Sequence, residues 1–307
     1  MQTIRLFVPG LALGFIAQAW ALPDSTGCGG SHDVGVPWKA GEAVLFRTSK
    51  LNVDADGAPN SYRVDGNGLS YTCDGVVAVV AGVRISPGMP MWQEQCRSSW
   101  AKATASGEYS GVAIFGFATN DKGKPIVQGD GDPLPGAAYI STTSISIPGA
   151  PEGTQRRYVD ATRIPYVVLP GNFRKTWKIR PGSLAIVYRP KTGKLAPAVF
   201  ADGGNLGEAS VRLHQDLGND PMAIKGGVQR AKVSIDDAVL TVVFPDRVSE
   251  PRADAQAWVA DISKQGAEAL ESFGGTSGLA SCAKQTTRRR AWPPPQCSFP
   301  AYWRPRC

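Results

Sequence analysis

Residues 183–204 read SLAIVYRPKTGKLAPAVFADGG and contain the clearest structural pattern in the chain. Two apolar runs flank the turn at Thr192-Gly193, which is the pattern of a β-hairpin. The second run ends at Asp202 and is followed by two glycines. A strand that ends in a carboxylate delivers that group to the edge where the core meets solvent. The stretch therefore predicts a β-rich core with an acidic residue at a strand end.

The rest of the chain extends this pattern. Gly and Pro are abundant, at 35 and 24 residues, and the apolar runs are short, as is typical of β-rich folds. A second hairpin is expected around Asp121-Lys122-Gly123. Further strands are expected over residues 76–81, 138–147, 166–169 and 238–244, and helices over residues 93–105, 208–217 and 253–273. The predicted fold class is mainly β, a β-rich α+β fold with a compact β-barrel-like core and a few flanking helices.

The first residues have the pattern of a secretory signal peptide. A basic residue, Arg5, precedes an apolar run, and Ala19-Trp20-Ala21 fits the small-x-small cleavage pattern. We expect the mature chain to be secreted or periplasmic. The expected division is a signal peptide (1–21), one main domain (22–250), a C-terminal helix packed on that domain (251–280) and a basic, Cys-containing tail (281–307).

The cysteines favour disulfides over a metal site. After the signal peptide an even number remains, without a C-x-x-C pair and without His at metal-ligand spacing: Cys28, Cys73, Cys96, Cys282, Cys297 and Cys307. In an exported chain this predicts up to three disulfides that tie the termini to the body. Their connectivity stays open.

The net charge of +7 belongs to the ends of the chain. Without Arg5 and the six basic residues from Lys284 onward, 26 basic and 26 acidic residues remain. The basic, aromatic tail could contact anionic cell-wall polymers, or could be a solvated extension pinned by a disulfide. We expect no nucleic-acid partner for an exported chain. No apolar stretch after the signal peptide is long enough for membrane insertion.

Several chemistries lack their motifs. The sequence has no G-x-S-x-G elbow, no P-loop and no H-E-x-x-H. Its two histidines are His32 and His214, and we expect His214 to be a half-exposed helix residue. NVDADG at residues 52–57 resembles the start of a calcium loop, but the twelfth position is Arg63 rather than the required Glu. No metal and no cofactor is therefore expected.

Two carboxylates remain as candidates for catalysis. Asp202 ends the strand described above, and Glu208, six positions further on, is expected to open a short helix after a Gly-rich detour. From spacing alone, a turn Asp and a helix N-terminal acid are the commoner explanation. The motifs around this pair change that judgement.

These motifs follow one another in a fixed order. They are YVDATRIPYVVLPGNF (158–173), PGSLAIVY (181–188) and AVFADGGNLGEASVRLHQDLG (198–218), with LNVDADGAPNSY and GDPLPGAAYISTTS upstream. Over residues 51–218 the chain resembles the bacterial branch of the chitosanases of glycoside hydrolase family 75. The sequence departs from that pattern at Ala201-Asp202-Gly203, where the family has G-D-T, and at Gly182-Ser183-Leu184, where it has G-D-L.

The resemblance implies endo-hydrolysis of β-1,4-linked glucosamine polymers with inversion, with Asp202 and Glu208 as the essential acids. One carboxylic acid protonates the leaving oxygen while the other carboxylate activates water, and the groups stand about 6.5–9.5 Å apart. We expect Glu208 to be the acid and Asp202 the base, although the sequence does not fix the two roles.

Chitosan is a polycation and should favour an acidic groove. The acids expected to bind it, each of which could instead shape a turn, are Asp54, Asp56, Asp130, Asp132 and Asp160. The aromatic residues expected to stack on sugar faces, each of which could instead be core, are Trp92, Trp100, Tyr139 and Trp177. Two rival functions stay open: a glycosidase of peptidoglycan or another amino-sugar polymer, and a non-catalytic carbohydrate-binding or wall-associated protein.

Overall fold

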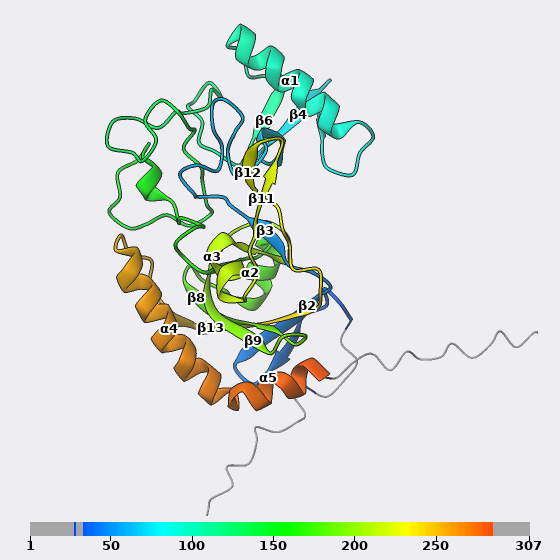
Figure 1. Cartoon of the computed structure of the whole chain (residues 1–307), viewed down its shortest axis with the longest axis vertical. Helices are drawn as coiled ribbons and strands as arrows, with labels where there is room; N and C mark the ends of the chain where they lie inside the picture. The colour runs from blue at the N-terminus through cyan, green and yellow to red at the C-terminus, as the bar shows by residue number, and fades with distance from the viewer. Residues whose placement is uncertain (1–27, 29–32, 285–307) are drawn as a thin grey trace, which may run out of the picture.

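The computed structural model of the chain describes residue 28 and residues 33–284. The predicted signal peptide, His32 and the tail beyond residue 284 lie outside the described residues. Figure 1 shows a large sheet in the lower part of the molecule and a small unit with helix α1 at the top.

The large sheet confirms the expected β-rich fold class. Its eight strands are mixed in direction and lie in the order β1-β2-β13-β8-β9-β7-β10-β3. No pairing between the two ends of this order, β1 and β3, is present within residues 33–284, so the core is an open sheet rather than the expected β-barrel-like one. The strands are β1 (Trp38–Ala40), β2 (Ala43–Thr48), β3 (Asn52–Asp54), β7 (Tyr166–Val168), β8 (Ser183–Arg189), β9 (Lys194–Asp202), β10 (Glu208–Ser210) and β13 (Val239–Val248).

The predicted hairpin forms the centre of this sheet. β8 and β9 pair in antiparallel fashion around the turn at Thr192-Gly193, and β13 pairs with the other edge of β8. All β8 residues except Arg189 are buried, and helix α4, which runs along the sheet in Figure 1, covers one of its faces. Gly266 of α4 permits this approach, since a Cβ there would lie 2.4 Å from Pro197 Cβ.

The small unit has its own sheet and core. Its strands lie in the order β5-β4-β6, and a disulfide joins Cys73 to Cys96 on α1. Four aromatic residues pack in the second core: Tyr62, Trp100, Phe117 and Tyr139. The elements of the small unit are η2 (Thr72–Asp74), β4 (Val76–Val80), β5 (Val83–Ile85), α1 (Trp92–Ser106) and β6 (Val112–Ile114).

The remaining elements connect or cover the two sheets. They are η3 (Gln155–Arg157), α2 (Gly171–Trp177), α3 (Val211–Asp216), the paired strands β11 (Met222–Lys225) and β12 (Val228–Ala231), α4 (Ala255–Ser272) and α5 (Gly275–Lys284). The C-terminal part thus forms two helices rather than one, and the first residues of the predicted tail belong to α5. A disulfide from Cys282 on α5 to Cys28 ties both ends of the described chain together.

Two local expectations are wrong. Residues 138–147 are irregular rather than a strand, because their backbone groups pair with several separate segments: Tyr139 N donates to Tyr62 O, and Thr142 N donates to Gly116 O. His214 is buried rather than half-exposed. Its Nε2 lies 3.1 Å from Asn52 O, and burial lowers its pKa to about 4.

Candidate active site

Strand β7 organises the candidate site because β9 and β10 pair with its two edges. Val168 of β7 is the register partner of Asp202 in β9. Val167 is the partner of Ala209, so the antiparallel register puts Glu208 beside Val168. Asp202 and Glu208 therefore lie in one row of the sheet, on either side of Val168. Since neighbouring strands are about 4.8 Å apart, the two backbones are separated by about 10 Å.

Glu208 begins a strand, and the expectation of a helix from residue 208 is wrong. β10 pairs in parallel with β3, with Glu208 opposite Asn52 and Ser210 opposite Asp54. Helix α3 starts only after Ser210, whose Oγ accepts a hydrogen bond of 3.1 Å from Leu213 N. The carboxylate is therefore fixed by a sheet rather than by a helix terminus.

The glycines between the two acids have separate roles. Gly207 has a φ of +87°, which favours glycine over any residue with a side chain. A Cβ on Gly204 would lie 2.7 Å from Glu208 Oε2, and one on Gly203 would lie 2.6 Å from Ser144 Oγ. The turn thus leaves room that any larger residue would take from the carboxylates.

Each carboxylate of the pair is oriented by nearby donors. Asp202 is only 6% exposed, and its Oδ1 accepts hydrogen bonds of 2.7 Å from both Ser144 N and Gly203 N. Glu208 is half-buried. Its Oε2 accepts from Asn205 N at 3.0 Å and its Oε1 from Asn205 Nδ2 at 3.1 Å. Both side chains therefore have a defined position before any ligand binds.

Two further carboxylates join Asp202. Asp54, Asp56 and Asp202 each have a carboxylate oxygen within 4.8 Å of the others, and we call these three residues the acid cluster. Asp56 N donates to Asp54 Oδ1 at 2.8 Å. Tyr166 Oη lies 3.2 Å from Asp54 Oδ2 and 2.9 Å from Asp56 O. Asp54 and Asp56 thus shape a turn and also face the candidate catalytic Asp.

The acid cluster holds protons at neutral pH. Burial is the largest cause that raises the pKa of Asp54 to about 8, followed by the charge of Asp202. Burial and the charge of Asp54 raise the pKa of Asp56 well above its usual range. Burial also raises the pKa of Asp202 to about 6, against the two backbone hydrogen bonds that lower it. So many close carboxylates cannot all be ionised together, and they titrate as a coupled group.

A second layer of side chains positions the cluster. Gly57 N donates to Ser141 Oγ at 2.9 Å, while Gln155 Nε2 donates to Gly57 O at 2.9 Å and Gln155 Oε1 accepts from Ser141 N at 2.8 Å. The segment from Ser141 to Ser144 therefore joins the Asp54–Gly57 turn to Asp202. These positioning residues were not predicted, because their neighbours in space are distant in sequence; only their presence within the GDPLPGAAYISTTS motif pointed to this segment.

The other predicted acids lie in loops with local partners. Asp132 is connected to the site only indirectly: its Oδ1 accepts from Gln155 N at 2.8 Å, and its Oδ2 from Gly129 N at 3.1 Å. Asp160 Oδ1 accepts from Thr162 N at 2.9 Å and Thr162 Oγ1 at 2.6 Å, and burial raises its pKa. Asp160 has the bonding of a turn residue, whereas Asp132 also joins its own loop to Gln155.

The predicted aromatic residues are dispersed. Trp177, at the end of α2, is partly buried against the main core. Tyr139 is 6% exposed and stacks on Phe117 with ring centroids 4.8 Å apart, so it belongs to the second core. Trp92 and Trp100 line a groove on the small unit.

Within the part of the chain that the structure describes, the acid cluster could also hold a metal ion, with one carboxylate oxygen from each residue as a ligand. Carboxylate oxygens suit a hard divalent cation, which prefers six or more oxygen ligands in the case of calcium. The three acids would supply only part of such a shell. Bound protons reduce the negative charge of the cluster and with it the attraction for a cation. The expectation that the chain binds no metal remains a prediction.

Comparison with known proteins gives no identification: no protein-family profile and no curated protein matches the chain. Among the described helices, none combines the length and the apolar character needed to cross a lipid bilayer.

Proposed function

We propose that this chain is an exported glycoside hydrolase that cleaves β-1,4 links within chitosan or a closely related amino-sugar polymer, with inversion. The observation that carries the proposal is the row formed by Asp202 and Glu208 on either side of β7. Their backbones are about 10 Å apart. From this spacing the two carboxyl groups can reach the separation of about 6.5–9.5 Å that an inverting enzyme needs.

We assign the proton donor's role to Asp202. Its raised pKa of about 6 keeps the carboxyl protonated in mildly acidic solution. Its proton passes to the glycosidic oxygen as the C1–O bond breaks. Glu208 accepts a proton from the water whose oxygen forms the new bond to C1. These roles reverse the expectation from the sequence, and Asp54 lies close enough to Asp202 to resupply the proton.

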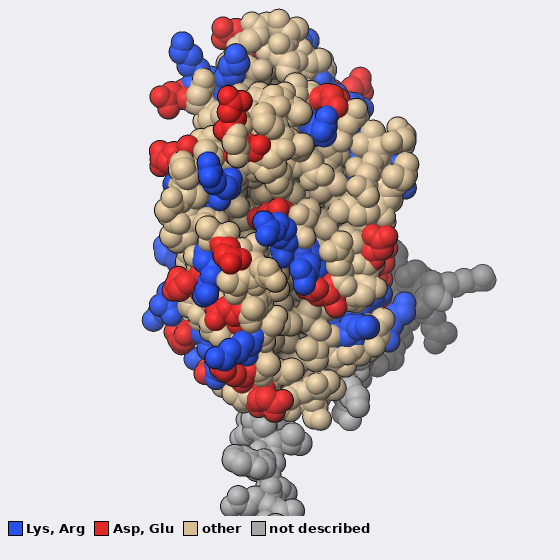
Figure 2. Space-filling model, turned by 60° about the vertical axis from the view of Figure 1, so that its left-hand side comes forward, with Lys and Arg blue, Asp and Glu red and all other residues tan. Residues whose placement is uncertain are grey.

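The charges around the site support an amino-sugar substrate. Partly ionised carboxylates of the acid cluster attract the protonated amine of a glucosamine unit. On the face in Figure 2, acidic and basic side chains are interspersed rather than gathered in one acidic field. Recognition of a cationic sugar would therefore depend on the acid cluster itself.

Export rests on the predicted signal peptide, and the two disulfides support it. Cys73–Cys96 and Cys28–Cys282 are bonds that persist in oxidising compartments.

The test is release of reducing ends from chitosans of graded acetylation. We expect Asp202→Asn and Glu208→Gln each to lower kcat by at least about 10²-fold. Glu268→Gln, the same chemical change on the exposed face of α4, should leave kcat unchanged. Full activity of either active-site variant would refute the assignment. Release from bacterial wall preparations alone would indicate a peptidoglycan glycosidase, and binding without release a non-catalytic protein.

A further inference from the structure

The small unit carries a groove that the proposed reaction does not use. Its volume is about 520 Å³, and its lining includes the aromatic side chains of Tyr71, Trp92 and Trp100 and the polar side chains of Asp74, Gln93 and Arg97. A site that mixes flat apolar faces with a few polar groups is typical of small-ligand binding. We call it the aromatic groove.

The aromatic side chains of the groove are accessible, and Trp100 among them is fixed by ring contacts. Tyr71 is 43% exposed, and Trp92 and Trp100 are half-buried. Trp100 is held by edge contacts to Phe117 and Tyr139, with ring centroids 5.8 and 6.0 Å away. A ring that is already fixed loses little entropy when a ligand binds. It offers a flat apolar surface on which the C–H face of a pyranose can stack.

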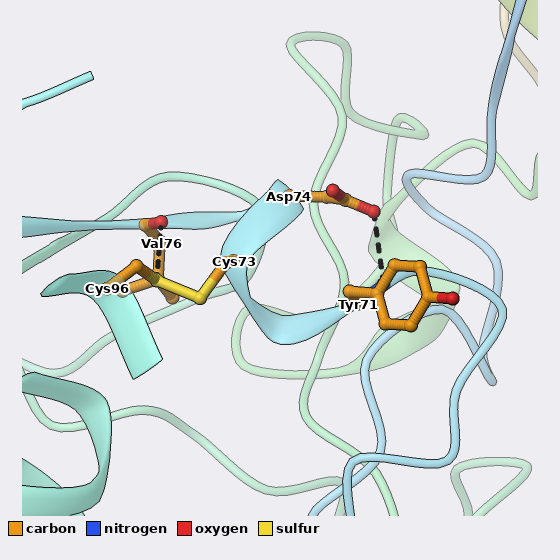
Figure 3. The surroundings of a disulfide bond; sticks show 5 residues. All are labelled: Tyr71, Cys73, Asp74, Val76 and Cys96. Carbon is orange, nitrogen blue, oxygen red and sulfur yellow. Dashed lines mark hydrogen bonds between the residues drawn. A yellow bond between two sulfur atoms is a disulfide. The ribbon is translucent and has the colours of Figure 1, made fainter. Parts of the chain in front are cut away.

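Basic side chains outnumber acidic ones in and beside the groove. Asp74 is the acid in its lining, and Lys232 Nζ pairs with it at 2.5 Å. Figure 3 shows the same carboxylate bonded to Tyr71, whose backbone N donates to Asp74 Oδ2 at 3.0 Å. The Arg230 guanidinium lies 4.3 Å from the Tyr71 ring centroid, and Arg97 is exposed in the lining. These cations repel an ammonium group, so an uncharged sugar is favoured over a protonated amino sugar.

The groove is adjacent to the acid cluster. Tyr62 forms a hydrogen bond with Asp56, and the charge of Asp74 contributes to the raised pKa of both Asp56 and Tyr62. The Tyr62 ring also contacts the backbone at Gly75, where a Cβ would lie 2.8 Å from Tyr62 Cζ. Gly75 directly follows Asp74, so one side chain bridges the two sites.

We propose that the aromatic groove binds uncharged, N-acetylated sugar units of a polymer whose cationic units meet the acid cluster. The proposal rests on the proposed function for its polymer, and it makes partly acetylated chains the preferred substrate. The two sites differ in charge, so each selects a different sugar.

The experiment is calorimetric titration of Glu208→Gln protein with tetramers of N-acetylglucosamine and of glucosamine. We expect Trp92→Ala to weaken binding of the acetylated tetramer about tenfold. Arg97→Glu should narrow the preference for the acetylated tetramer about tenfold, whereas Arg84→Glu, an exposed charge reversal on β5, should not change it. Circular dichroism checks that each variant is folded.

Two results would overturn the proposal: acetylated tetramer bound equally well after Trp92→Ala, or an unchanged preference after Arg97→Glu. Hydrolysis by the unmodified enzyme is measured separately. If that assay shows no hydrolysis while binding depends on Trp92, the proposed function fails and the groove remains a saccharide site.

Discussion

At the scale of single residues, the site combines groups that oppose one another. Asp54, Asp56 and Asp202 would repel each other if all were ionised, and burial adds to the penalty. The carboxyl groups stay close together because Tyr166 Oη and backbone N–H groups donate hydrogen bonds to them. All three acids are candidates from the sequence, but only as separate residues, since no local pattern indicates that they meet in the fold.

Replacing Asp54 with Asn should stabilise the protein at high pH. The folded-state pKa of about 8 exceeds the unfolded value of about 3.9. The stability that comes from protonation is therefore complete at low pH and lost as the pH rises through about 8. The neutral amide removes this loss. We expect Asp54→Asn to melt about 2–4 °C above the wild type at pH 8, and much closer to it at pH 5.

Differential scanning calorimetry at the two pH values measures this effect. Asp246→Asn, at an exposed position of β13, is the matched control and should show no such pH dependence. An equal difference in melting temperature at both pH values would show that Asp54 is ionised in the folded protein.

At the scale of elements, local patterns predicted strands well where partners are local. The β8–β9 hairpin follows from its apolar runs and turn. Glu208–Ser210 became a strand because it is captured between β3 and β7, and β3 lies far away in the sequence. The prediction of a strand over residues 138–147 is wrong for a related reason: the backbone groups of this segment form hydrogen bonds with several distant segments. Tertiary pairing overrode the local preference in both cases.

Ser210 joins three elements at this junction. Its Oγ accepts from Tyr166 N of β7 at 3.0 Å and from Leu213 N of α3 at 3.1 Å. Ser210→Ala leaves both buried donors unpaired, so we expect a loss of about 2–3 kcal/mol in the free energy of unfolding. Urea unfolding measures it. Ser263→Ala on the exposed face of α4 should cost less than about 0.5 kcal/mol, and an equal cost for both would contradict the role of Ser210.

At the scale of the whole molecule, the two units present two chemically different sites. The large sheet presents the acid cluster, and the small unit presents the aromatic groove lined by Arg97. Composition predicted a neutral body, but it could not reveal that acids gather where β3 and β9 end, while cations gather near Tyr71. The even number of cysteines predicts up to three disulfides, and the described residues contain two of them. The pairing of Cys28 with Cys282 follows only from the fold, because the two residues are 254 positions apart in the sequence.

The most direct test of the central claim is the anomeric form of the first product. Proton NMR during hydrolysis of a soluble, partly acetylated chitosan reports it before the anomers interconvert. Water activated by Glu208, from the face opposite to the Asp202 proton donor, predicts the α-anomer as the first product. Initial release of the β-anomer would show that a carboxylate attacks the sugar directly. That result would contradict the proposal that Asp202 and Glu208, on either side of β7, act with a water molecule between them.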